Sequence, residues 1–186
     1  MSEFSRSTLF TLFIFLASIV AGIMVTVGNP GAGQQMLNIF KETILGEFLD
    51  NSPIMLAVKL FLNNLEACIF MFLGGASLGI LTAFIIMTNG VVIGSVLELF
   101  RQEQGILYIA AALIPHGIFE ISAFIISGSL GFLLARELWK EWKWEGDAAI
   151  AALGMGRTFL RVVIPLVAIA ALTEVFITPE IIRLVA

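Results

Sequence analysis

Long uncharged apolar stretches dominate the hydropathy pattern of the chain. No Asp, Glu, Lys or Arg occurs from Thr8 to Val27, or from Ala67 to Leu97. An apolar stretch of 18 or more residues is long enough, as a helix, to cross the ~30 Å hydrocarbon core of a bilayer. The pattern therefore predicts an all-α protein, built as a polytopic bundle of transmembrane helices.

About five membrane segments follow from these stretches, within a single transmembrane domain that covers residues 1–186. Four of them are predicted as spans: residues 8–27, 65–87, 115–135 and 159–177. We expect Asn89-Gly90 to end the second of these, Pro115 to begin the third, and Pro165 to break or kink the fourth. The first is about twice as long as a signal-peptide core and precedes the turn Gly28-Asn29-Pro30-Gly31, so we expect a retained anchor.

The stretch between residues 91 and 114 is less regular. Residues 91–103 end in polar side chains and residues 106–114 are apolar but short. Neither piece crosses a bilayer as an ordinary span. Two interpretations stay open: a re-entrant helical hairpin with a polar tip, or a short, thin span formed by residues 91–103.

Two further segments are predicted at the membrane surface. Apolar residues recur every three or four positions within residues 34–50, which predicts an amphipathic helix that lies on the bilayer or on the protein's own surface. Residues 136–158 combine basic residues with Trp139, Trp142 and Trp144. By the positive-inside rule and the aromatic belt, this loop is expected in the cytoplasm, with the C-terminus on the extracytoplasmic side.

Composition supports the membrane interpretation and excludes other classes. The chain is 59% hydrophobic and 13% charged, with a mean hydropathy of +1.03, whereas soluble domains are about 25% charged. Ten basic against fourteen acidic residues leave no basic stripe for a nucleic acid. The single cysteine, Cys68, forms no intramolecular disulfide or cysteine metal cluster and is expected to be a small core residue.

The candidate chemistry centres on the only histidine. His116 and Glu120 are four residues apart after Pro115, so they share one face of a helix. An ionisable residue inside a bilayer costs several kcal/mol unless it is paired, so this pair is a candidate functional site. Four further polar residues are expected to belong to the same intramembrane site: Glu66, Asn63, Asn64 and Asn89. Glu98 and Glu174 are other carboxylates beside or within apolar stretches.

Three roles remain for this polar site: a structural network, a proton or ion pathway, and a metal-dependent catalytic site. One histidine is too few for the common zinc patterns, and no His-Glu-x-x-His or Gly-x-Ser-x-Gly motif is present. We therefore expect no enzyme activity and no cofactor, and leave metal binding open.

Small residues four positions apart predict close helix packing. The pairs are Ser18 with Gly22, Gly75 with Gly79, and Ser127 with Gly131. Such pairs let helix backbones approach closely, either within one compact bundle or across a homodimer.

Ordered motifs between Asn63 and Gly131 resemble the stage II sporulation protein M family. They are Asn63-Asn64 before Phe72-Leu73-Gly74-Gly75, Asn89-Gly90 with Gly94, Pro115-His116-Gly117 with Glu120, and Gly128 with Gly131. The resemblance implies an all-helical protein of about five spans with an N-terminus inside, and it favours the thin span. Asn63, Asn64, Asn89, Pro115, His116, Gly117 and Glu120 are then the family's characteristic positions.

The same resemblance implies a function. The family's namesake anchors and organises peptidoglycan-degrading partners, so a non-catalytic organiser of membrane or envelope proteins in the bilayer is the first expectation. A transport component that binds an ion, proton or polar solute at the His116 site is the alternative. A second, looser resemblance supports an ATPase partner, because Asp147-Ala148-Ala149, Gly154, Arg161 and Ile164-Pro165 look like the cytoplasmic loop of ABC-transporter permeases.

Overall fold

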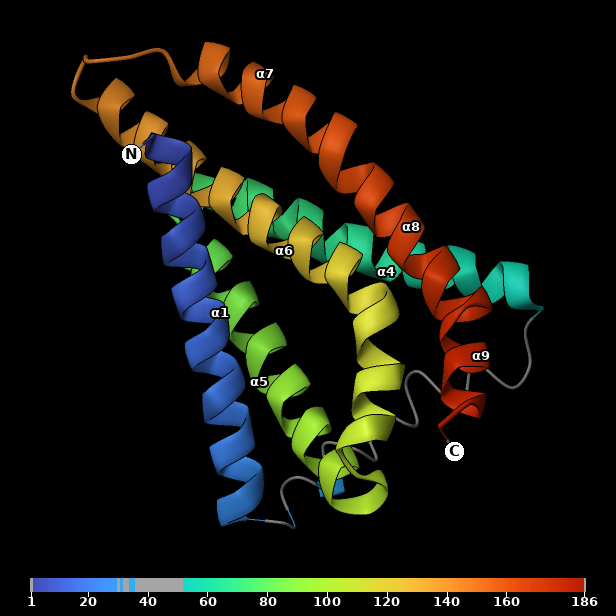
Figure 1. The fold of residues 1–186 in the computed structure, drawn as a ribbon. Coiled ribbons are helices and arrows are strands. Elements are labelled where there is room, and N and C mark those ends of the chain that lie inside the picture. The colour runs from blue at the N-terminus through green and yellow to red at the C-terminus, as the bar shows by residue number, and fades with distance from the viewer. Residues whose placement is uncertain (1, 30, 32–33, 36–51, 186) are drawn as a thin grey trace.

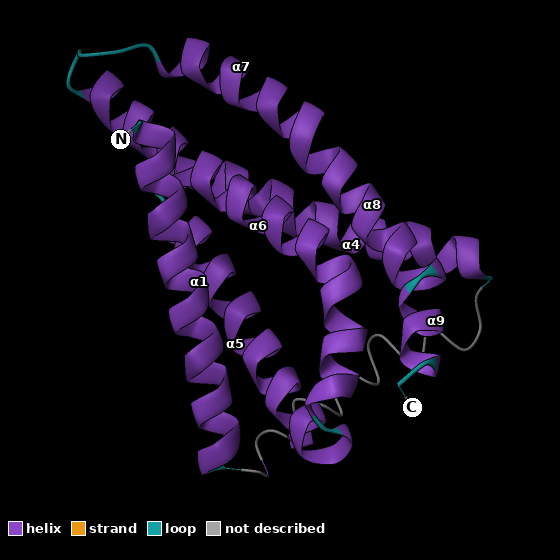
Figure 2. Cartoon of the chain, viewed as in Figure 1, coloured by secondary structure: helices purple, strands orange, loops and turns teal. Residues whose placement is uncertain are grey.

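The computed structural model describes residues 2–29, 31, 34–35 and 52–185, and every regular element in these residues is a helix. Figures 1 and 2 show an open bundle in which long helices run side by side. The predicted all-α class is therefore confirmed. The surface helix predicted for residues 34–50 lies almost wholly outside the described residues.

Five helical segments among the described residues are long and apolar enough to cross a membrane. The first four are α1 (Glu3–Gly28), α4 (Pro53–Leu73) with the short helix η2 (Gly74–Ser77), α5 (Ile80–Gln104) and α6 (Ile106–Trp142). The fifth is a run of four pieces: α7 (Ala148–Thr158), η3 (Phe159–Val163), α8 (Ile164–Phe176) and α9 (Thr178–Arg183). Their outer faces carry many exposed large apolar side chains, as lipid contact requires.

The second and third segments meet earlier than the sequence predicts. The predicted span 65–87 is interrupted at Leu78 and Gly79, whose φ angles are +55° and +83°. Two consecutive residues with positive φ cannot continue a right-handed helix. Asn89-Gly90 instead lies inside α5, where Asn89 Nδ2 donates a hydrogen bond of 2.9 Å to the Ile85 carbonyl of the same helix.

The irregular stretch is neither a re-entrant hairpin nor a thin span. Residues 91–103 are the second half of α5, and residues 106–114 are the first part of α6, with a turn at Gly105 (φ +84°) between them. Pro115 lies inside α6 and does not begin it. A proline lacks the N–H for one helical hydrogen bond, and the yellow part of α6 bends in this region (Figure 1).

The C-terminal part also differs from the prediction in detail. Residues 136–158 are mostly helical: α6 continues to Trp142, and α7 begins at Ala148. Asp147 is the N-cap of α7, and its carboxylate accepts a hydrogen bond of 3.0 Å from the Ile150 N–H. Pro165 does not break the last segment. It follows the π-helical turn η3, which widens the helix just before the proline.

Small residues bring the helix backbones together within one chain. A Cβ on Gly94 would meet backbone atoms of Ile19 in α1, and one on Gly22 would meet backbone atoms of Val91 and Ser95 in α5. Ser95 Oγ also donates to the Gly22 carbonyl at 3.2 Å. The close packing predicted for Ser18 and Gly22 is therefore intramolecular.

A second close contact joins the end of α4 to α6. A Cβ on Gly75 would meet the Gly131 carbonyl, and one on Gly131 would meet the Met71 carbonyl and Thr82. Thr82 Oγ1 donates to the same Met71 carbonyl at 2.8 Å. Gly128 packs in the same way, because its Cβ would meet Ile86 and Thr11 side chains. These contacts hold α1, α4, α5 and α6 around one core.

The beginning of α1 lies beside the end of α6 (Figure 1). The Glu3 carboxylate pairs with Arg136, and Lys140 Nζ lies 3.5 Å from Glu3 Oε2. The N-terminus and the 143–147 loop are therefore at the same end of the bundle. With five crossing segments, the C-terminus is at the other end.

Candidate functional site

A cavity of about 470 Å³ lies between α4, α5, α6 and α8. Its apolar wall consists of Leu, Val, Ile and Phe side chains with Gly117. Its polar wall consists of Asn63, Asn64, Asn89, His116, Glu120 and Glu174. No lysine or arginine lines it among the described residues. The cavity thus has a mostly apolar lining with one polar wall, within helices that are apolar enough to span a membrane.

His116 and Glu120 lie well inside the bundle. Glu120 follows the start of α6 by about 21 Å along the helix axis, since an α-helix rises 1.5 Å per residue. The side chains of His116 and Glu120 are only 13% and 21% exposed. At this depth, charged groups depend on partners from the protein, on water or on a bound ion.

Hydrogen bonds fix the orientation of the histidine ring. Thr178 Oγ1 donates its only proton to the Thr173 carbonyl at 3.2 Å. The same oxygen lies 3.3 Å from His116 Nδ1, so it accepts from an Nδ1–H. In the neutral ring, this arrangement places the proton on Nδ1 and leaves a lone pair on Nε2.

The free ring nitrogen faces carboxylates. His116 Nε2 lies 4.0 Å from Glu120 Oε2, which is too long for a hydrogen bond. Glu174 reaches the same place from α8, and ligand atoms of the three residues lie within 4.8 Å of one another. Among the described residues, Glu174 has no hydrogen-bond or ion-pair partner. Two carboxylates and a lone pair therefore converge without a positive group beside them.

The asparagines add acceptors to the same wall. Asn63 Nδ2 donates to Asn64 Oδ1 at 3.4 Å, and Asn89 Nδ2 donates to the Ile85 carbonyl. These bonds use amide donors of Asn63 and Asn89 and leave their oxygens as acceptors. The cavity lining is accordingly rich in groups that attract cations.

A comparison with known protein families covers the same part of the chain. The family model of stage II sporulation protein M matches residues 11–179, which include all the cavity residues. The chain belongs to this family. It is a multi-pass membrane protein, as the sequence motifs and the five apolar segments indicate.

Two proteins of Methanocaldococcus jannaschii are similar to this member of the stage II sporulation protein M family. Uncharacterized protein MJ0793 of Methanocaldococcus jannaschii is 31% identical over 123 residues, or 64% of this chain and 68% of the relative. Uncharacterized protein MJ0706 of the same organism is 39% identical over 84 residues, or 45% of this chain and 35% of that relative. No solved structure matches the chain.

The structure of this stage II sporulation protein M family member brings together five of the six residues predicted for the polar site. Asn63, Asn64, Asn89, His116 and Glu120 all line the cavity, with Gly117 of the same motif. Pro115 lies in the adjoining part of α6. Gly79 takes the positive φ of the turn before α5, and Gly75, Gly128 and Gly131 make the helix contacts described above.

Glu66 is the exception, and Glu174 takes its place. Glu66 is exposed and is not part of the cavity lining. Leu60, Asn63 and Asn64 form the cavity face of α4, and Glu66 lies about 110° around the helix from the middle of that face. Glu174 was recognisable from sequence only as a carboxylate within an apolar stretch. Its place beside His116 depends on how α8 packs against α6.

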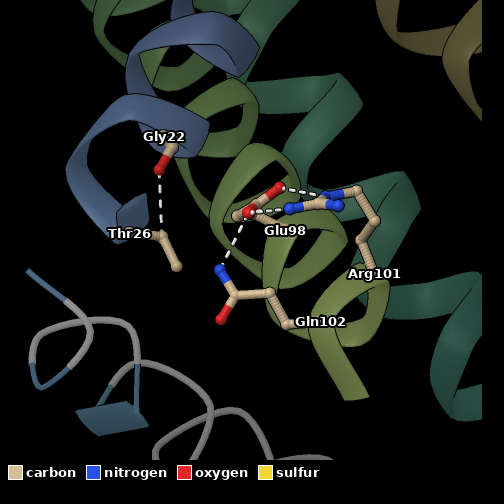
Figure 3. A network of polar contacts seen from close by, with 5 residues as sticks. All are labelled: Gly22, Thr26, Glu98, Arg101 and Gln102. Carbon is tan, nitrogen blue, oxygen red and sulfur yellow. Dashed lines mark hydrogen bonds and ion pairs between the residues drawn. The ribbon is translucent and has the colours of Figure 1, made fainter. Parts of the chain in front are cut away.

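Glu98 belongs to a separate polar cluster at the end of α5 (Figure 3). Its carboxylate accepts from Arg101 Nε and Nη2 and from Gln102 Nε2, each at 2.8 Å. The carboxylate is 5% exposed, and Figure 3 shows it near Thr26 of α1. Its oxygens are already used by donors of the same helix, and Glu98 does not line the cavity.

Proposed function

We propose that this chain is a non-catalytic membrane transport component that binds a small cation in the cavity between α4, α5, α6 and α8. The observation that carries the proposal is the convergence of Glu120 and Glu174 on His116 Nε2, with no lysine or arginine lining that cavity. The proposed function is movement of the cation through this chamber.

Electrostatics supports this choice over a purely structural network. A buried carboxylate costs several kcal/mol when ionised, unless hydrogen bonds or an opposite charge compensate it. A structural network would satisfy its members, as the Glu98 cluster does with Arg101 and Gln102. Glu174 has no such donor among the described residues, whereas a cation would compensate both carboxylates of the cavity.

Flux through proteoliposomes tests the proposal. The full chain is reconstituted and assayed with trapped pyranine for protons, tracer sodium and rubidium for monovalent cations, and trapped calcein for Mn²⁺. We expect protein-dependent flux of at least one of these ions. Glu120→Gln and Glu174→Gln should each lower it by about tenfold or more, because each removes a negative charge that attracts the ion.

The matched control is Glu66→Gln, which makes the same change on the outer face of α4 and should leave the flux unchanged. All variants are compared only where they elute as single, monodisperse species. Absence of flux for every probe, or equal flux in the cavity variants and in Glu66→Gln, would contradict the proposal.

A second function, the organisation of partner proteins, is supported by the end of α6. Trp142 and Trp144 are 72% and 95% exposed, and Lys143 Nζ lies 5.3 Å from the centre of the Trp139 ring. Exposed aromatic residues beside basic ones bind headgroups or protein partners. By the positive-inside rule this end faces the cytoplasm, with the N-terminus beside it and the C-terminus outside.

Affinity capture from gently solubilised native membranes separates the two functions. If the chain is an organiser, envelope or membrane proteins should be recovered in stoichiometric amount. They should be lost in the double variant Trp142→Ala/Trp144→Ala if they bind at this end. Stoichiometric recovery of an ATPase would instead support a transporter that contacts its ATPase through α7. Unchanged recovery in the double variant would contradict a role for the tryptophans.

A further inference from the structure

Three ligand-type side chains meet at one point of the cavity wall. His116 and Glu120 come from successive turns of α6, and Glu174 comes from α8. One ligand atom from each lies within 4.8 Å of the other two. We propose that these three residues form a binding site for a divalent transition-metal cation, of the Mn²⁺, Fe²⁺ or Zn²⁺ class.

The donor set points to this class of metal. Imidazole nitrogen is a ligand for Zn²⁺, Fe²⁺ and other transition metals, whereas Mg²⁺ and Ca²⁺ prefer oxygen ligands alone. Among the described residues, no cysteine or methionine lines the cavity, so the soft ions that prefer sulfur have no ligand in its wall. One nitrogen and two carboxylates suit a borderline divalent cation. They also balance its charge, because the two carboxylates carry −2.

The histidine is already oriented as a metal ligand. Ligating histidines generally donate their second ring N–H to an oxygen, which fixes the tautomer and the ring. His116 Nδ1–H donates to Thr178 Oγ1, and that hydroxyl donates in turn to the Thr173 carbonyl. The free lone pair on Nε2 then points toward the carboxylate side, where Glu120 Oε2 is 4.0 Å away.

Small side-chain shifts would close the site around an ion. Two ligands at about 2.1 Å from a tetrahedral metal are about 3.4 Å apart. The separation of 4.0 Å between Nε2 and Oε2 exceeds that by about 0.6 Å, and the 4.8 Å that bounds the other separations exceeds it by about 1.4 Å. The cavity of about 470 Å³ is far larger than one ion, so water would complete the coordination. A site with three protein ligands and exchangeable water suits a transported ion, which has to dissociate from the site again.

This inference rests on the proposed function, because it names the substrate class of the same cavity. Binding at equilibrium and flux are therefore measured separately. Metal binding without flux of any ion would overturn the transport function and keep the metal site. Proton or monovalent-ion flux without metal binding would overturn the metal site and keep the transport function.

The experiment uses the full chain, purified and freed of metal with a chelator, and titrated with Mn²⁺. Electron paramagnetic resonance of free Mn²⁺ reports binding, and electron spin echo envelope modulation reports a ligating nitrogen. We expect about one saturable Mn²⁺ per chain and ¹⁴N modulation from one imidazole. The modulation is measured on the unmodified protein, so this outcome does not depend on any variant folding.

Two variants identify the ligands. His116→Asn keeps an amide N–H near the position of Nδ1, so it can still donate to Thr178, but it removes Nε2. It should weaken Mn²⁺ binding by about tenfold or more and abolish the ¹⁴N modulation. Glu174→Gln should weaken binding similarly but retain the modulation. Glu66→Gln should behave like the unmodified chain.

The proposal is overturned if the unmodified chain binds no Mn²⁺ saturably, or if the bound ion shows no imidazole nitrogen. It is equally overturned if monodisperse His116→Asn and Glu174→Gln proteins bind Mn²⁺ as tightly as Glu66→Gln.

Discussion

Gly94→Leu is expected to yield no folded, monodisperse protein. A Cβ at this position would lie about 3 Å or less from backbone atoms of Ile19, and backbone cannot move aside as a side-chain end can. Overpacking a core already costs about 1–3 kcal/mol when side chains can adjust. Here α1 and α5 would have to separate along their whole contact. Size-exclusion chromatography and thermal unfolding in detergent measure the result.

Gly154→Leu is the matched control for this change. It adds the same side chain to a helical glycine of α7, where a Cβ would meet no atom within 4 Å. This variant should elute and unfold like the unmodified chain. If Gly94→Leu also did so, the close approach of α1 and α5 would not hold the bundle together.

Thr178→Val is expected to weaken Mn²⁺ binding by about 10- to 100-fold, the usual effect of removing the hydrogen-bond partner of a metal-ligating histidine. Valine has the shape of threonine but cannot accept the Nδ1–H of His116. The ring then loses both its orientation and the preference for a proton on Nδ1. The measurement is the Mn²⁺ titration described above.

Thr178→Ser provides the rescue for this prediction. Serine keeps the hydroxyl that accepts from His116 and donates to the Thr173 carbonyl, so its affinity should be close to that of the unmodified chain. A purely structural role of the threonine would not separate the two variants in affinity when both are folded. Equal Mn²⁺ affinity of Thr178→Val and Thr178→Ser would contradict the positioning role.

The membrane fold could be predicted because length and polarity alone decide whether a helix spans a bilayer. The positions of the breaks could not. Asn89-Gly90 carries turn-forming residues, yet Asn89 bonds to its own helix and Gly90 packs against Ser18 of α1. The true break at Leu78 includes a residue that rarely adopts positive φ. Tertiary contacts in the bundle therefore overrode the local signals.

The part of the candidate site that lies on a single helix could be predicted from the sequence. Four-residue spacing places His116 and Glu120 on one face of α6 without knowledge of the fold. The choice between Glu66 and Glu174 required the packing of α8 against α6, and the choice of tautomer required Thr178, 62 residues from His116. The spacing of residues along the sequence shows neither the packing of α8 against α6 nor the contact between Thr178 and His116.

The length of α6 relates the cavity to the thickness of the surrounding bilayer. Its 37 residues extend about 55 Å, whereas a bilayer with its headgroups measures about 40–45 Å. A straight helix of this length would have to incline by about 35–43° to remain within that layer. The bend near Pro115 lets the two parts of α6 take different inclinations. A change of inclination between these two parts would be centred next to His116 and the cavity wall.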